Sequence, residues 1–153
     1  MEGEKVLPTR GQLERQLSQT IQSLYRERFG HLPSKVVCHL FSDKLAIVVE
    51  DAITVIEKLL IENSRLDLAE KMRLTVDRNF SLQVKQTINE ILQVEIIDLI
   101  SESCLDSNYL GMIAILNNAP EVRVSSKMKN YQSERPKEIS IPLPLALSAE
   151  VDS

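Results

Sequence analysis

The clearest alternation of apolar and polar residues lies in KVVCHLFSDKLAIVVED, residues 35–51. Side chains alternate between the two faces of a strand, so this pattern predicts two strands joined by a two-residue turn at Ser42–Asp43. The predicted register places Leu40 opposite Leu45, and one face of the hairpin is then wholly apolar. Its members are Val36, Cys38, Leu40, Leu45, Ile47 and Val49. The other face carries Val37, His39, Phe41, Lys44, Ala46, Val48 and Glu50.

The neighbouring Cys38 and His39 therefore point to opposite sides of the predicted sheet. A thiolate and an imidazole need hydrogen-bond contact to act together, so this pair is not a local catalytic dyad. We interpret Cys38 as a small core residue and His39 as a residue of the half-buried opposite face.

A helical period precedes the hairpin. Leu13, Leu17, Ile21 and Leu24 recur at spacings of three and four residues, which predicts a helix over residues 10–29. Thr9 with Gln12 fits a capping box at its start, and Gly30 suits a left-handed cap at its end.

Two further helical segments follow the hairpin. Thr54 with Glu57 resembles a second capping box, with Asp51 as a rival cap, and Ser64 with Asp67 resembles a third. The third opens a segment toward residue 92 that either breaks near Ser64 or merges with the segment before it. Its apolar stripe is Leu66, Ala69, Val76, Phe80, Val84, Ile88 and Ile91. Its charges are assigned to a solvated face: Glu70, Lys71, Arg73, Asp77, Arg78 and Lys85.

A second hairpin is predicted from VEIIDLISESCLDSNYLGMIAILNN, with strands over 94–102 and 109–117 and a turn over 103–108. The order α-ββ-αα-ββ predicts an α+β two-layer sandwich, in which helices cover one face of a four-stranded antiparallel sheet.

We divide the chain into a flexible N-terminus (1–9), this domain (10–118) and a mostly disordered tail (119–153). Within the tail, ISIPLPLAL is an apolar segment that could dock on the domain, on a second subunit or on a partner.

The opposite sheet face, with Val37, His39, Phe41 and Val48, is only partly polar and is our candidate interaction face. We therefore expect a homodimer, formed across this face or by pairing of strand edges. Phe41→Glu should then give a folded monomer.

Charge and composition limit the possible functions. A formal net charge of −4 argues against nucleic-acid binding, which depends on neutralising phosphates. No apolar run reaches the roughly 20 residues of a membrane-spanning helix, and the N-terminus does not look like a secretory signal, so we expect a cytoplasmic protein without direct membrane insertion. Cys38 and Cys104 are then expected to stay reduced.

Signatures of catalysis are missing from the sequence. There is no glycine-rich phosphate loop, nucleophile elbow or zinc motif, so we assign no catalytic residue, no cofactor and no metal ligand. Asp98, Glu102 and Asp106 could line a cation site, but we interpret them as solvent-facing residues near a turn.

The arrangement of these segments resembles the MpsC family over about residues 10–118. The similarity is carried by ERFGHLPSKVVCHLFSDKLAIVVED, TVIEKLL, the basic Arg78, and VEIIDLISESCLDSNYLGMIAIL. Gln93 stands where the family usually has glycine. The resemblance implies association with a sodium-translocating, membrane-potential-generating system whose other components are linked to inorganic-carbon uptake, and it supplies no catalytic residues.

We therefore predict a non-enzymatic accessory or regulatory module that docks on another protein, with a member of a membrane complex as the candidate partner. The alternatives are a small-molecule or ion-sensing domain, or an unrecognised enzyme, with His39 and Arg78 as ligand contacts.

Overall fold

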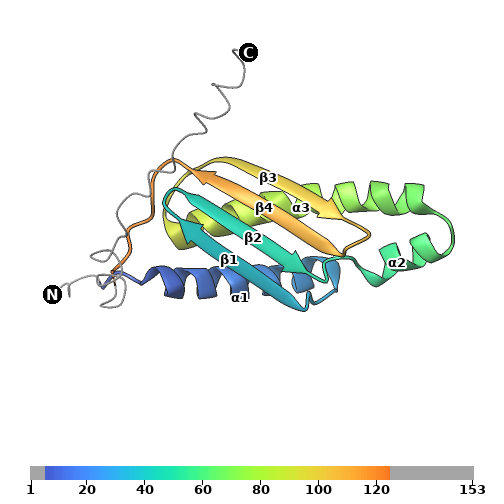
Figure 1. Ribbon diagram of the computed structural model, residues 1–153, viewed down its shortest axis with the longest axis horizontal. Helices are drawn as coiled ribbons and strands as arrows, with labels where there is room; N and C mark the ends of the chain where they lie inside the picture. Colours follow the sequence, from blue (N-terminus) through green and yellow to red (C-terminus); the bar gives the residue numbers. More distant parts are fainter. Residues whose placement is uncertain (1–5, 125–153) are drawn as a thin grey trace, which may run out of the picture. The chain divides into compact units, whose positions relative to one another are not determined.

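The described part of the chain, residues 6–124 of the computed structural model, forms three helices and a four-stranded sheet (Figure 1). In chain order these are α1 (Arg10–Phe29), β1 (Lys35–Phe41), β2 (Lys44–Glu50), α2 (Val55–Glu62), α3 (Leu66–Leu92), β3 (Ile96–Cys104) and β4 (Tyr109–Leu116). This order confirms the predicted α-ββ-αα-ββ arrangement and the α+β class. The predicted tail lies outside the described residues from position 125 onward, as does its apolar segment.

The sheet is antiparallel with strand order β1-β2-β4-β3, so the two hairpins are joined through β2 and β4. The register of the first hairpin is the predicted one, with Leu40 opposite Leu45 and Cys38 opposite Ile47. Ser42 adopts a positive φ of 57° in the turn, which a two-residue hairpin loop requires. Cys38 is buried and His39 is exposed, which confirms that they point to opposite faces.

The second hairpin differs from the prediction. β3 runs from Ile96 to Cys104 rather than over 94–102, and the turn between the strands is shorter than predicted. Ser103, which was predicted in the turn, belongs to the strand and pairs with Leu110, as Ser101 pairs with Met112. The prediction followed β-branched residues, but Ser103 continues the alternation of the strand without being large or apolar.

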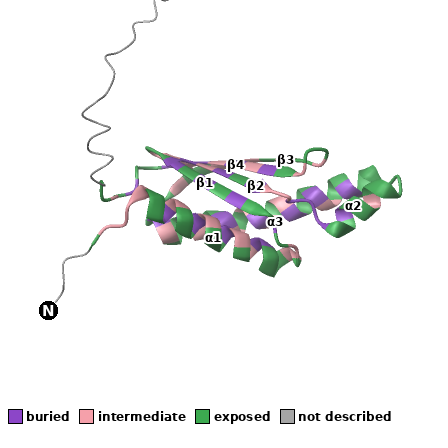
Figure 2. Cartoon of the chain, turned by 60° about the horizontal axis from the view of Figure 1, so that its bottom comes forward, coloured by how far each residue is buried: buried purple, intermediate pink, exposed green. Residues whose placement is uncertain are grey.

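The core lies between the sheet and the two long helices, which cover the same face (Figure 2). α1 packs mainly on β1, and α3 packs on β3 and on α1. Tyr25, Phe29 and Phe80 form edge-to-face contacts where the two helices meet, with ring centroids 4.9 to 6.0 Å apart. The buried positions of α3 follow the predicted stripe from Ala69 to Ile88, whereas Leu66 is exposed.

The helix boundaries follow the expected caps in two of three cases. Thr9 with Gln12 and Thr54 with Glu57 both form complete capping boxes, and Gly30 is left-handed at φ 65°. The capping box predicted at Ser64 is wrong, because the N-cap of α3 is Arg65, without a side-chain cap. Ser64 has a φ of 60° and belongs to the turn that ends α2, so it lacks the extended backbone of an N-cap.

The face of the sheet turned away from the helices is not covered by any described helix (Figure 2). Cross-strand pairs place apolar side chains along it, as Val37 with Val48, Ala46 with Ile113, and Ile113 with Ile100. We call this surface the outer sheet face. Its apolar members are Val37, Phe41, Ala46, Val48, Ile100, Ile113 and Ile115.

Candidate functional site

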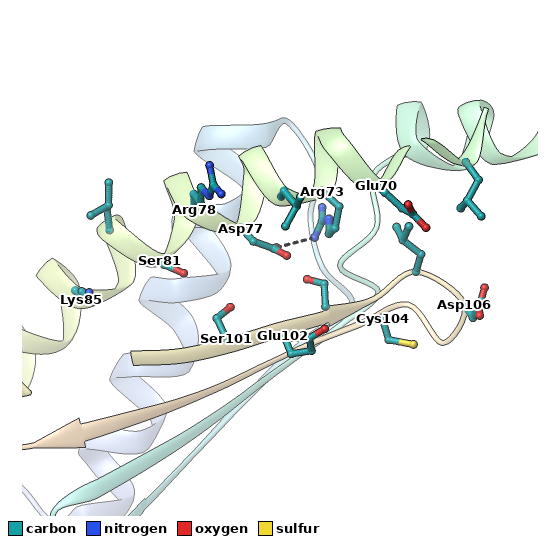
Figure 3. A pocket seen from close by; sticks show the side chains of 15 residues that line it. Glu70, Arg73, Asp77, Arg78, Ser81, Lys85, Ser101, Glu102, Cys104 and Asp106 are labelled. Carbon is teal, nitrogen blue, oxygen red and sulfur yellow. Dashed lines mark hydrogen bonds and ion pairs between the residues drawn. The ribbon is translucent and has the colours of Figure 1, made fainter. Parts of the chain in front are cut away.

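A pocket of about 880 Å³ lies between α3 and β3 and is the candidate functional site (Figure 3). One side is a face of α3 with residues at helical spacing, including Glu70, Asp77, Arg78, Ser81 and Lys85. The other side is the end of β3 and the turn after it, from Ser101 to Asp106. Its volume is within the usual range for small-molecule sites in proteins, about 300–1,000 Å³.

The pocket exists because β3 turns small side chains toward the helix layer. Ser101 and Ser103 occupy inward positions, whereas the inward positions of β1 and β2 carry larger side chains such as Leu40, Leu45 and Ile47. The space beside the serines is bordered by three exposed leucines of α3. These leucines are Leu66, Leu74 and Leu82.

A buried ion pair lies at the inner wall of the pocket. The Arg73 guanidinium donates from Nε to Glu57 Oε2 at 2.7 Å and from Nη2 to Glu57 Oε1 at 2.6 Å. The side chain of Glu57 is fully buried and that of Arg73 is 5% exposed. Such a two-point contact fixes both side chains and joins α2 to α3.

The same guanidinium also connects to α1 and to the loop before α2. Nη2 donates to the Tyr25 hydroxyl at 3.0 Å, and that hydroxyl donates to the carbonyl of Ala52. Thr54 donates to Glu57 Oε1 from its hydroxyl at 2.8 Å. Burial raises the pKa of the Tyr25 hydroxyl, although the nearby positive charge of Arg73 acts in the opposite direction.

This network corrects the assignment of Arg73 to a solvated face. Burial by itself would lower the pKa of the guanidinium, but its hydrogen bonds to Glu57 and Tyr25 raise it, so Arg73 is always charged. The sequence signal that could have identified it is its place in the apolar stripe, between Ala69 and Val76. The sequence predicted Glu57 only as the capping-box partner of Thr54. Glu57 does form that capping box, in addition to its ion pair with Arg73.

Asp77 connects the ion pair to the open part of the pocket. Its carboxylate accepts from Arg73 Nη1 at 3.4 Å, and its side chain is 17% exposed. Burial raises the pKa of Asp77, and Ser103 and Arg73 partly oppose this effect. The Ser103 hydroxyl lies near the carboxylate, but its geometry falls short of a formed hydrogen bond.

Charges are unevenly distributed along the pocket. Arg78 and Lys85 lie toward one end with Ser81 between them, and Glu70 and Asp106 lie toward the end formed by the β3–β4 turn (Figure 3). Within the described residues, neither Arg78 nor Lys85 takes part in an ion pair. The Ser101 hydroxyl is buried and has no hydrogen-bond partner among the described residues.

The two predicted ligand contacts do not come together. Arg78 lines the pocket, but His39 lies on β1, at the opposite edge of the sheet from β3. His39 Nδ1 is 3.3 Å from Glu14 of α1, and its ring stacks on Phe41 with centroids 5.9 Å apart. His39 therefore belongs to the outer sheet face with Val37, Phe41 and Val48.

The acidic residues considered as a cation site are also separated. Glu102 and Asp106 border the pocket, but Glu102 pairs with Gly111 and so shares the outer side of β3 with Asp98, which pairs with Ile115. Within residues 6–124, no group of three or more histidine, cysteine or acidic side chains is placed to hold a metal ion.

Comparison with known proteins gives one match. A family model described as Na+-translocating membrane potential-generating system (MpsC) matches residues 9–118. No curated protein and no solved structure matches the chain. Among the helices of the described residues, none combines the length and the apolar character needed to cross a membrane.

Proposed function

Because this chain belongs to the MpsC family, we propose that it is a non-enzymatic accessory or regulatory module of a membrane ion or inorganic-carbon transport system. In this role it works in the cytoplasm and binds other protein surfaces, a second copy of itself among them. The family description, which names a membrane-potential-generating system, supports the link to transport.

The observation that carries the docking role is the uncovered outer sheet face. Val37, Phe41 and Val48 are 39%, 43% and 39% exposed, although all three lie in paired strands. Burying a large apolar side chain contributes about 1.5–3 kcal/mol, so a contact that covers this face is favourable. A two-fold contact between copies would cover the same patch on both.

The substitution Phe41→Glu tests this contact. It places a charge on the outer sheet face and leaves the core unchanged, so we expect it to convert a dimer into a folded monomer. Gln19→Glu on the exposed surface of α1 adds the same charge elsewhere and should leave the dimer intact. Analytical ultracentrifugation at tens of micromolar measures the assembly, and circular dichroism reports folding.

A monomeric unmutated protein under these conditions would rule out the contact between copies.

The transport link is tested separately. In cells that lack this chain, a voltage-sensitive dye measures the membrane potential at high and low sodium. We expect a smaller sodium-dependent potential, restored by the unmutated chain and by Gln19→Glu but not by Phe41→Glu. An unchanged potential in the deletion strain would contradict the link to transport.

The pocket supports a second candidate function, the sensing of a small molecule. Arg78, one of the two residues that the sequence suggested as ligand contacts, lines this pocket. A regulatory module of this kind would change its contacts when the ligand binds.

A further inference from the structure

We propose that residues 139–147 of this chain add a further strand to the sheet, antiparallel to β3, and cover the pocket between α3 and β3 with their apolar side chains. The segment lies outside the described residues, but its sequence fits the edge that the described residues leave open. This contact uses an edge of the sheet and not the outer sheet face, so it goes beyond the proposed function.

β3 is an edge strand, and the hydrogen bonds of its neighbour β4 show which backbone groups it leaves unpaired (Figure 1). The amide of Leu116 donates to the carbonyl of Asp43, in the turn before β2, and the amide of Asn117 donates to the carbonyl of Glu95, just before β3. Backbone groups alternate between the two sides of a strand. In β4, therefore, residues with inner side chains bond to β2, and residues with outer side chains bond to β3.

The same alternation continues in β3. Glu102 pairs with an outer residue of β4, so its N–H and C=O groups face β4. The N–H and C=O groups of Ser101 and Ser103 then point away from the sheet, toward what we call the free edge of β3. The opposite edge of the sheet is partly covered, because Glu14 of α1 accepts from the Leu40 amide at 2.7 Å. The free edge of β3 is therefore the one that can accept another strand.

Apolar surface lies beside this free edge. Leu66, Leu74 and Leu82 of α3 are exposed and line the pocket. The inner side chains of β3 at this place are the small Ser101 and Ser103, and Figure 3 shows Ser101 below α3. Large apolar side chains on the inner face of an added strand would fill the space between the leucines and the serines, and their burial would stabilise the contact.

Residues 139–147, ISIPLPLAL, alternate in the way that such a strand requires. Every odd position is isoleucine or leucine, whereas the even positions are Ser140, Pro142, Pro144 and Ala146. In a strand, all five large side chains would share one face. Both prolines, which lack an N–H group, would have their nitrogen on the same side of the strand. Proline occurs in edge strands where that side is turned to solvent.

Only an antiparallel strand meets both conditions. In β3, the residues with inner side chains direct their backbone groups to the free edge. The chirality of the residues fixes this relation, and reversing the strand direction reverses it. An antiparallel strand therefore directs the backbone groups of its inner residues, Ile141, Leu143 and Leu145 among them, toward β3. A parallel strand with the same face inward would instead turn Pro142 and Pro144 toward β3, where two donors would be missing.

The intervening chain is long enough for this contact. Residues 124–138 separate the segment from Arg123, and these fifteen residues span about 50 Å when extended, at 3.3–3.6 Å per residue. α3, with 27 residues, is about 40 Å long at 1.5 Å per residue. Attachment to the same chain also gives the segment an effective concentration on the order of millimolar, which favours it over a second copy at micromolar concentration.

Amide hydrogen exchange of the full chain, followed by nuclear magnetic resonance, tests the pairing. The amides of Ser101 and Ser103 should exchange about tenfold or more slowly in the unmutated chain than in Leu145→Pro, which removes a donor to β3. Ala146→Pro is the matched control, because it places proline where the amide faces solvent, and it should keep the protection. The amide of Glu102, which faces β4, should stay protected in all three proteins.

Equal exchange of Ser101 and Ser103 in the unmutated chain and in Leu145→Pro would overturn the proposal. Loss of protection in Ala146→Pro would overturn the antiparallel pairing. Protection that rises with protein concentration would assign the free edge to a second copy and would also overturn the proposal. Circular dichroism checks that each variant folds. Ultracentrifugation of the same variants reports the contact on the outer sheet face, which neither change should affect, so the two proposals fail separately.

Discussion

At the scale of single residues, the burial of Arg73 and Glu57 has a large energetic consequence. Removing two charges from water is costly, and their attraction compensates only when the remaining hydrogen-bonding groups are also satisfied. Here Tyr25 and Asp77 accept from the guanidinium, and Thr54 donates to the carboxylate. The pair therefore fixes how α1, α2 and α3 meet, and it forms the inner wall of the pocket.

We predict that Arg73→Met destabilises the protein by about 3–5 kcal/mol, because it leaves the Glu57 carboxylate buried without a countercharge. Arg73→Met combined with Glu57→Gln should cost clearly less than the sum of the two single changes. Urea denaturation followed by circular dichroism measures both. Arg78→Met, five positions away and exposed, is the control and should change stability by no more than about 0.5 kcal/mol.

The two cysteines should differ in reactivity. Burial raises the pKa of the Cys38 thiol to about 11, whereas a hydrogen bond from Ser107 lowers the pKa of the exposed Cys104 below the ordinary 9.0. The thiolate is the reactive form, so Cys104 should react with iodoacetamide at a rate that rises with pH and reaches half its maximum below 9.0.

Peptide mass spectrometry after brief labelling of the native protein locates the modified thiol. Cys38 should be labelled only after denaturation, and Cys104→Ser should abolish the fast reaction. Rapid labelling of native Cys38 would contradict its position on the buried face of the first hairpin.

At the scale of elements, helix ends combine well-formed caps with one unfavourable residue. Gln93 ends α3 in the left-handed conformation, with φ 55° and ψ 41°. A residue with a Cβ is disfavoured there, and glycine is the usual choice.

We predict that Gln93→Gly stabilises the protein by roughly 0.5–1 kcal/mol, since it removes this backbone strain and loses only the exposed bond from Gln93 Nε2 to the Glu90 carbonyl. Gln86→Gly, the same change within the helix, should instead destabilise by about 1 kcal/mol. The midpoints of urea denaturation should move in opposite directions. A fall in both midpoints would show that the left-handed strain at Gln93 is negligible.

At the scale of the whole domain, the segment after β4 returns to the start of α1. The amide of Arg123 donates to the Pro8 carbonyl at 2.8 Å, and Thr9 forms a parallel bridge with Arg123. Pro120 is buried and Val122 packs against the core. Residues 119–123, which the sequence analysis assigned to the tail, therefore contact the domain.

We predict that a chain ending at residue 118 is less stable than one ending at residue 124 by roughly 2–4 kcal/mol, because it exposes the surface that Pro120 and Val122 cover. Thermal denaturation of the two truncated chains, both starting at Met1, makes the comparison. Equal stability would show that this segment contributes no net free energy to folding.

The sequence by itself determined the parts of this protein that depend on neighbours along the chain. The register of the first hairpin follows from alternation and a two-residue turn, and the start of α1 follows from Thr9 and Gln12. Both structures form within a few residues. The family resemblance and the order of elements were recognisable for the same reason.

Only the tertiary structure decided what forms the candidate site. Arg73 meets Glu57 across 16 positions and Tyr25 across 48, and periodicity along one helix does not indicate which other element it will contact. The same limit made His39 and Arg78 equal candidates, although they lie at opposite sides of the sheet. The sequence placed Ser101 in a strand and Ser103 in the turn after it, and both line a pocket because β3 directs them toward α3.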